Sequence, residues 1–338
     1  MEKISIDGSQ FEGGGSILRV AVPIAAALGK EITVYNIRKK RANPGLRQQH
    51  LIGLKLITAV VNGELQGGEV GSEQITLVPR AYKRRNHQIS IPTAGSITLI
   101  MQIVQNYVSA SGNEVECTFS GGGTHTNFSP TWDEVKIVTA YHFGKMGVKF
   151  EMDLQKVGFY PRGGAKGHFR IWKDKITSVP RFEEDTDDQK TTVISLASKA
   201  LERAKVVERQ IQGFKKHWKG KIEEISEYVD TDPGTALIGI YNGKFRKGYS
   251  NLGAKGKPAE KVGAELADLM ANDASKDALD IYVSDQILVP LTFSPSGSSA
   301  RIVNTDHVQA NLHVIDQILP ESLEVKNLGN GILEVTKL

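Results

Sequence analysis

The chain has 338 residues, of which 42 are lysine or arginine and 38 are aspartate or glutamate, so its formal net charge is only +4. This length supplies enough apolar material for a buried core, and the composition excludes a disordered or low-complexity chain. The single cysteine, Cys117, excludes an intrachain disulfide, and no apolar run reaches the ~20 residues that span a bilayer. We therefore expect a soluble, cytoplasmic protein with no membrane partner.

Residues 3–80 carry alternating and helical patterns of apolar residues in an order typical of a βαβαββ unit. We expect its helices and strands at residues 4–6, 17–28, 32–37, 47–61, near 65, and at 75–78. Residues 87–172 show the same order again, with a period of about 85 residues. Such self-similarity predicts an internal duplication.

A third unit follows at residues 278–338, after a segment of different character that opens with an acidic, proline-containing linker. Within that segment we expect a strand, a long charged helix from Ser195 to about Phe214, further strands near 236–241 and a helix at 258–270. The predicted fold class is α/β (α+β): three tandem βαβαββ-type repeats form a large domain, residues 1–179 and 278–338, with a smaller inserted α/β domain, residues 180–277.

The segment at residues 301–320 has the apolar spacing of an amphipathic helix, formed by Val308, Leu312, Ile315 and Leu319. Asp306 is the expected cap, with Gln309 completing a capping box. His307 then lies in the first turn, where the positive end of the helix dipole disfavours imidazolium and attracts phosphate oxygens. Taken alone, a histidine at a helix start is more often a cap or a surface residue than a catalyst.

The residues from Glu12 to Ser16 form a glycine-rich turn before an apolar helix that contains Arg19. A tight turn and a phosphate site are equally good interpretations of the glycines, although neither the P-loop nor the dinucleotide-binding pattern is present. The loop that follows is basic and carries Arg38, Arg41 and His50. Guanidinium groups suit phosphate oxygens, so we favour anion binding over a solvated basic loop.

The stretch from Tyr282 to Gln286 opens the third unit. Asp285 could hold a divalent metal or a ribose, and Tyr282 offers a ring for stacking on a base, although an acidic residue near a helix start is more often a cap. No Cys and His set has zinc spacing, which excludes structural zinc.

Several blocks spread along the chain resemble the RNA 3'-terminal phosphate cyclases. They are Ile6-Asp7-Gly8, Glu12 to Gly15 with Ile17-Leu18-Arg19, Asn36-Ile37-Arg38, Pro44-Gly45-Leu46, Gln49-His50-Leu51, Ala94-Gly95-Ser96 with Gln102, Gly158-Phe159-Tyr160-Pro161 with Gly163-Gly164, and Asp285-Gln286 followed by the His307 helix. The resemblance implies the three-repeat large domain with its insert. It also implies a reaction in which ATP adenylylates a histidine, AMP passes to an RNA 3'-phosphate as an RNA-adenylate, and the 2'-OH closes a 2',3'-cyclic phosphate.

On this basis His307 is the expected AMP-accepting nucleophile, with pyrophosphate as the leaving group. The cationic and polar candidates around the phosphates are Arg19, Arg38, Arg41 and His50. A divalent metal, Mg or Mn, would lie near Glu12 or Asp285. The resemblance implies ATP contacts from Gln102, Pro130, Tyr282, Val283, Ser284, Asp285 and Gln286. An RNA with a 3'-phosphate end is the implied partner, and a homodimer is left open.

Two departures from the family pattern concern the nucleophile and the adenine side. The family reads His-Leu-x-Thr-Asn where this chain has His307-Val308-Gln309-Ala310-Asn311, and the loop at 124–130 lacks the usual Thr-Asp opening.

Two other functions are alternatives to an RNA 3'-terminal phosphate cyclase. One is a non-catalytic, cyclase-like RNA-binding factor of ribosome biogenesis, against which His307 argues. The other is enolpyruvyl transfer on the related architecture, which needs more repeats than the three seen here.

Overall fold

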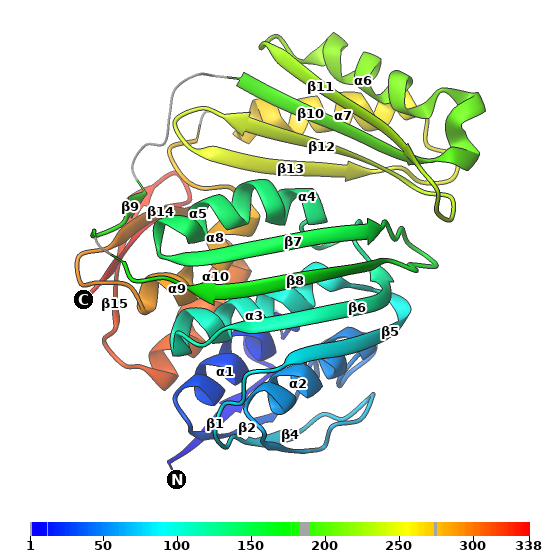
Figure 1. Cartoon of the computed structure of the whole chain (residues 1–338). Coiled ribbons are helices and arrows are strands. Elements are labelled where there is room, and N and C mark those ends of the chain that lie inside the picture. The colour runs from blue at the N-terminus through cyan, green and yellow to red at the C-terminus, as the bar shows by residue number, and fades with distance from the viewer. Residues whose placement is uncertain (1, 12, 177, 183–189, 274–275) are drawn as a thin grey trace.

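A computed structural model describes residues 2–11, 13–176, 178–182, 190–273 and 276–338. Within these residues the strands form four sheets of four strands, each with helices packed against it (Figure 1). The mixed α/β class predicted from the sequence is confirmed. None of the described helices combines the length and the apolar character needed to cross a membrane.

The first sheet has the strand order β1-β2-β4-β3. Its elements are β1 (Lys3–Asp7), α1 (Ser16–Ala27), β2 (Glu31–Tyr35), α2 (Gln48–Val60), β3 (Glu64–Gln66) and β4 (Ile75–Val78). Residues Ser16 to Ala26 of α1 are all buried, because this helix packs against α3 and α10 as well as β2. The helix start, and Arg19 with it, therefore lies inside the protein.

The second sheet has the order β5-β6-β8-β7. Its elements are β5 (Asn86–Ser96), α3 (Ile97–Ser111), β6 (Val115–Gly123), α4 (Trp132–Glu134), η1 (Val135–Thr139), α5 (Ala140–Lys145), β7 (Val148–Lys156) and β8 (Lys166–Lys173). The π-helical turn η1 lies between α4 and α5 and interrupts the α-helical run from Trp132 to Lys145; such local widening is often found near functional sites. Ser96 caps α3 by accepting from Leu99 N.

The third sheet has the order β15-β16-β14-β9. Its elements are β9 (Arg181–Phe182), α8 (Ile281–Gln286), α9 (Leu288–Thr292), β14 (Ser299–Val303), α10 (Asp306–Ile318), β15 (Leu323–Gly329) and β16 (Ile332–Lys337). The short strand β9 runs parallel to β14. It therefore joins the third sheet although it follows the predicted boundary at residue 180.

The fourth sheet, at the top of Figure 1, has the order β11-β10-β12-β13. Its elements are β10 (Lys190–Ser198), η2 (Lys199–Ala204), α6 (Val206–His217), β11 (Ile222–Val229), β12 (Thr235–Asn242), β13 (Arg246–Leu252) and α7 (Ala259–Asp273). The prediction of one helix from Ser195 to Phe214 was wrong for its first part. Residues up to Ser198 belong to β10, because pairing with both β11 and β12 outweighs their helical preference.

The apolar side chains of the fourth sheet divide between two clusters. Val193 and Leu237 join a cluster with α6 and α7, whereas Ile194 and Ile238 join the larger core of the other three sheets. We propose that the fourth sheet with α6 and α7 forms the inserted domain predicted at 180–277, and that the large domain predicted at 1–179 and 278–338 also includes β9. The first two sheets contain elements in the βαβαββ order, and the three repeats remain an interpretation of that order.

Candidate active site

One pocket is lined by side chains from four helices, α1, α3, α8 and α10, and from the loop before α4. Its lining residues are Arg19, Leu99, Gln102, Phe128, Pro130, Ile281, Tyr282, Asp285, Gln286, Thr305 and His307. Seven of these are residues that the sequence analysis singled out. The start of α10 therefore meets α1, α3 and α8 at a single site.

His307 lies in the first turn of α10, as predicted, but the cap is Thr305 and not Asp306. Thr305 has an extended backbone, and its Oγ1 accepts from Val308 N at 3.2 Å. Asp306 is already the first helical residue, and the Gln309 amide donates to Asn304 instead of closing a capping box. The expected position of His307 at the helix start is unaffected by this shift.

Arg19 is held in a fixed orientation at the pocket wall. Its Nε donates to Gln102 Oε1 at 2.6 Å, and its side chain is buried. Asn106, one turn further along α3, donates to the Arg19 carbonyl at 2.9 Å. A guanidinium whose Nε is engaged in this way presents its remaining donors in a fixed direction, which suits an anion in the pocket.

The glycine-rich turn packs tightly against the side chains of His50 and Arg19. A Cβ on Gly15 would lie 2.3 Å from His50 Nε2 and 3.0 Å from Arg19 Nη1, so no larger residue fits there without displacing them. His50 Nδ1 accepts from Arg47 N at 3.2 Å. In the neutral ring the proton is therefore on Nε2, which faces the turn.

Burial, together with Arg19, Arg38 and Arg47, lowers the pKa of His50 to about 3. The unfolded chain thus binds a proton at this residue below about pH 6.5 that the folded protein does not bind, so stability decreases as the pH falls. We expect wild type to lose about 2 kcal/mol more stability than His50→Asn between pH 7 and pH 5. Urea unfolding of both proteins at the two pH values measures this difference. Equal losses would contradict a buried neutral ring.

The structure brings neither Arg38 nor Arg41 to the pocket. Arg38 Nη1 donates to the carbonyls of Asn43 at 2.7 Å and Gly45 at 3.0 Å. This guanidinium therefore stabilises the conformation of its own loop. Arg41 is exposed on the same loop. Their predicted contacts with phosphate oxygens remain predictions.

The opposite wall is formed by α8. Tyr282, Asp285 and Gln286 line the pocket, and Asn311 of α10 donates to the Asp285 carbonyl at 3.1 Å. Val283 instead belongs to the core. The Ser284 hydroxyl donates to Leu279 O and accepts from Val303 N. Val283 and Ser284, which were expected to contact ATP, therefore do not line the pocket; they hold α8 in place through packing and hydrogen bonds.

Four lining residues were missed by the sequence analysis, namely Leu99, Phe128, Ile281 and Thr305. Phe128 is 96% exposed and has a φ of 62°, a backbone conformation that is uncommon outside glycine. Its position two residues before Pro130 could have indicated a role at the rim. Leu99 and Ile281 carry no such local signal.

The described residues contain no group of three or more His, Cys, Asp or Glu side chains that could hold a metal ion. Asp285 lines the pocket, whereas Glu12 lies outside the described residues. Magnesium commonly takes one or two carboxylates and completes its shell with water and substrate phosphates. The single carboxylate of Asp285 is sufficient for magnesium binding of this kind. Its role as a metal ligand remains a prediction.

Comparison with known proteins identifies the family. A model of the family described as RNA 3'-terminal phosphate cyclase matches residues 10–325. The chain belongs to this cyclase family. Its resemblance to these cyclases, predicted from the motifs alone, is thereby confirmed.

Several relatives are named RNA 3'-terminal phosphate cyclase. One from Thermococcus kodakarensis is 33% identical, covering 100% of this chain and 99% of its own length. One from Pyrococcus furiosus is 34% identical, covering 96% and 95%. One from Methanopyrus kandleri is 32% identical, covering 96% of each chain. The likeness to these cyclases thus includes both the pocket and the fourth sheet.

Proposed function

We propose that this chain is a nucleotidyl-transferring ligase that converts an RNA 3'-terminal phosphate to a 2',3'-cyclic phosphodiester at the expense of ATP. The observation that carries the proposal is the pocket in which a histidine at a helix start, a buried arginine and a tyrosine meet. Membership of the cyclase family supports the same reaction class.

The first step is attack by an imidazole nitrogen of His307 on the α-phosphorus of ATP. A phosphoramidate bond forms, the bond to the β-phosphate oxygen breaks, and pyrophosphate leaves. Arg19, held by Gln102, would stabilise the charge that develops on the phosphate oxygens. His50 does not line the pocket; its Nε2 faces the glycine turn and would donate a hydrogen bond to an anion bound at that turn.

In the second step an oxygen of the RNA 3'-phosphate attacks the phosphorus bound to His307, which gives an RNA-adenylate and frees the imidazole. The adjacent 2'-OH then attacks the 3'-phosphorus, loses its proton, and expels AMP. The cyclic phosphodiester is the product. A single pocket can serve all three steps because each one displaces a group at phosphorus.

ATP is consumed as a substrate, and the pocket offers groups suited to each of its parts. Tyr282 and Pro130 provide two faces for adenine. Gln102, Asp285 and Gln286 provide polar groups for the rest of the ATP molecule. A divalent cation near Asp285 would supply charge neutralisation for the triphosphate. Asn311, which donates to the Asp285 carbonyl, helps to fix the backbone of this wall.

The direct test is conversion of RNA ends. Purified protein is incubated with ATP, magnesium or manganese, and an RNA that ends in a 3'-phosphate, and the 3' end is analysed by resistance to phosphatase. We expect ATP-dependent formation of a phosphatase-resistant cyclic end, and no reaction with a 3'-OH control. An unchanged 3'-phosphate in the presence of both ATP and metal would contradict the proposal.

Removal of the Tyr282 ring should weaken ATP binding more than it slows the chemistry. Loss of one aromatic stacking face costs about 1–3 kcal/mol, so we expect Tyr282→Ala to raise the KM for ATP by a factor between about 5 and about 150. Tyr282→Phe keeps the ring and should remain close to wild type. Initial rates of AMP transfer at varied ATP concentration measure both parameters, and an unchanged KM in Tyr282→Ala would exclude the stacking role.

The alternative function is a non-catalytic RNA-binding factor of ribosome biogenesis. The position of His307 in the pocket that Arg19 also lines favours the enzyme. Tight binding of structured RNA with no covalent nucleotide on the protein would favour the alternative.

A further inference from the structure

Two buried carboxylates lie directly behind the pocket walls. Glu134 is 3% exposed and Asp280 is 1% exposed, and neither lines the pocket. Burying a carboxylate costs free energy unless hydrogen bonds compensate it. The groups that donate hydrogen bonds to Glu134 and Asp280 therefore identify the segments that these two carboxylates hold in place.

Asp280 joins α8 to the fourth sheet. Its Oδ1 accepts from Tyr282 N and Val283 N, both at 2.9 Å, and so caps the helix that carries Tyr282 and Asp285. Its Oδ2 accepts from Gly248 N of β13 at 3.1 Å. One carboxylate thus connects the first turn of a pocket wall with a strand of the proposed inserted domain.

Glu134 makes the corresponding connection on the side of Pro130. Its Oε2 accepts from Thr131 N at 2.6 Å, and the Thr131 hydroxyl accepts in return from Glu134 N. This capping box fixes the chain directly after Pro130. A Cβ on Gly248 would lie only 3.2 Å from Glu134 Cγ. Both walls therefore reach the same residue of β13.

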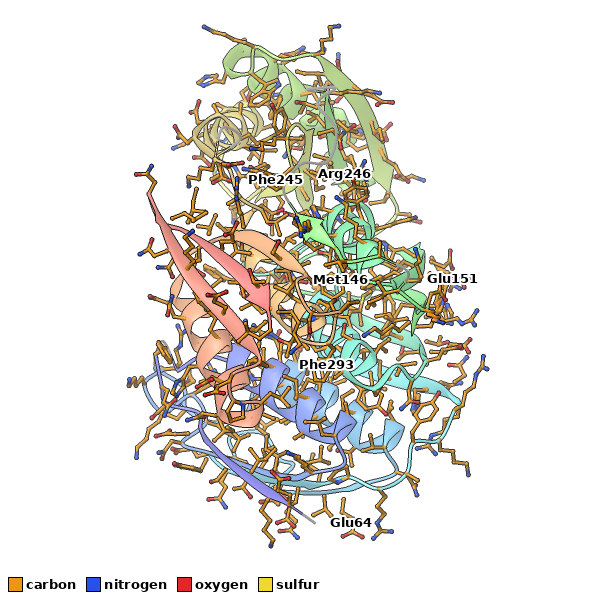
Figure 2. The ribbon with its side chains drawn as sticks, turned by 90° about the vertical axis from the view of Figure 1, so that its left-hand side faces the viewer. Glu64, Met146, Glu151, Phe245, Arg246 and Phe293 are labelled. Carbon is orange, nitrogen blue, oxygen red and sulfur yellow. The ribbon has the colours of Figure 1, made fainter. Side chains whose placement is uncertain are left out.

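The first residues of strand β13 also contact the proposed large domain. The guanidinium carbon of Arg246 lies 3.9 Å from the centroid of the Tyr141 ring, and His142 Nε2 donates to the Arg246 carbonyl at 2.8 Å. Phe245 is buried in the main core. Figure 2 shows Phe245 and Arg246 where the upper and lower parts of the molecule meet.

We propose that Asp280 and Glu134 are positioning residues that hold the two walls of the ATP pocket against Gly248 of β13, so that ATP affinity depends on how the fourth sheet is docked. This inference rests on the proposed function and adds a role for the inserted domain. The domain acts on the nucleotide site without contributing a lining residue to it.

An amide substitution separates the two contacts of Asp280. Burial raises the pKa of Asp280 to about 6, against the opposing effect of its backbone donors and Lys247, so at pH 8 the group is ionised and both oxygens accept. Asparagine has one oxygen and one NH₂ group. Asp280→Asn can therefore cap α8 or accept from Gly248 N, but it cannot do both.

Gly248→Ala tests the same link from the fourth sheet. Its methyl group would lie 3.1 Å from Val138 Cγ2 and 3.2 Å from Glu134 Cγ, so β13 or these two side chains must move apart by a few tenths of an ångström. Asp273→Asn is the matched control. Asp273 is a buried carboxylate that accepts from Tyr249 OH at 2.8 Å, and no hydrogen bond or ion pair joins it to either pocket wall in the described residues.

The readout is the rate of AMP transfer to the protein at pH 8 as a function of ATP concentration, with thermal unfolding midpoints measured in parallel. We expect Asp280→Asn and Gly248→Ala to raise the half-saturating ATP concentration about fivefold, the effect of one lost hydrogen bond, while the maximal rate changes less than about twofold. Asp273→Asn should leave both kinetic parameters unchanged even if it lowers the unfolding midpoint.

Glu134→Gln should retain wild-type affinity because glutamine also completes a capping box, whereas Glu134→Ala should not. Folded Asp280→Asn and Gly248→Ala proteins with wild-type ATP dependence would overturn the inference. So would an equal loss of affinity in Asp273→Asn, because the effect would then follow general destabilisation. Absence of AMP transfer in wild type would instead refute the proposed function.

Discussion

Replacement of His307 by alanine is expected to abolish the transfer of labelled AMP from ATP to the protein. This ring lies at the start of α10 and lines the same pocket as Arg19 and Tyr282, and without it no phosphoramidate can form. Removal of a covalent nucleophile typically lowers the rate by several orders of magnitude, on the order of a millionfold in well-studied enzymes. Labelling should therefore fall below detection, and cyclisation of RNA ends should be lost with it.

His313→Ala is the matched control for this experiment. His313 lies on the same helix but lines a different cavity, next to Phe11. The control should be labelled like wild type if the position in the pocket matters. Undiminished labelling of His307→Ala would refute the assignment of the nucleophile.

Replacement of Arg19 by alanine is expected to slow AMP transfer by about 100-fold or more, as removal of a preorganised charge-stabilising donor does in other active sites. The reason is its geometry: Gln102 fixes the guanidinium at 2.6 Å, so its donors are oriented before ATP binds. Arg19→Lys keeps the charge but loses the planar fork, and we expect an intermediate rate.

Single-turnover labelling at saturating ATP measures these rates. Arg209→Ala serves as a control, because Arg209 pairs with Glu260 in the fourth-sheet region and does not line the pocket. Circular dichroism must show that Arg19→Ala is folded, since the change removes a buried side chain. A folded Arg19→Ala protein that transfers AMP at the wild-type rate would exclude a role for this guanidinium in the chemistry.

The features that sequence reasoning predicted correctly are those encoded over short distances. The spacing of Val308, Leu312 and Ile315 gave the helix that carries His307. For the lone arginine in the apolar stretch around Arg19, sequence reasoning indicated an anion or Glu12 as the partner; the structure shows Gln102 as a partner, and Glu12 lies outside the described residues. For the helix, residues within a few turns of each other contain the relevant information, whereas the Gln102 partner of Arg19 lies 83 residues away and no local pattern indicates it.

The errors arose where neighbours distant in sequence decide the outcome. Residues after Ser195 favour a helix by composition, but β10 lies between β11 and β12 and its last residues are buried. At α10 both Thr305 and Asp306 are acceptable caps, and the extended backbone of Thr305 determines which one is used.

The pocket walls show the same limit. Asp280 and Gly248 are 32 residues apart and share a hydrogen bond, and Leu99 and Ile281 meet at the pocket only because α3 and α8 are packed into one body. A periodic pattern contains no information about such pairings. The residues that line the site were therefore predictable only where a local pattern or a family motif marked them.

Mass analysis of peptides from protein incubated with ATP and magnesium tests the central claim most directly. We predict an increase equal to one AMP on the peptide that contains His307, with fragmentation placing the added mass on that residue and with reversal when RNA bearing a 3'-phosphate is added. An AMP adduct on any other residue, or no adduct in protein that converts RNA ends, would contradict the account.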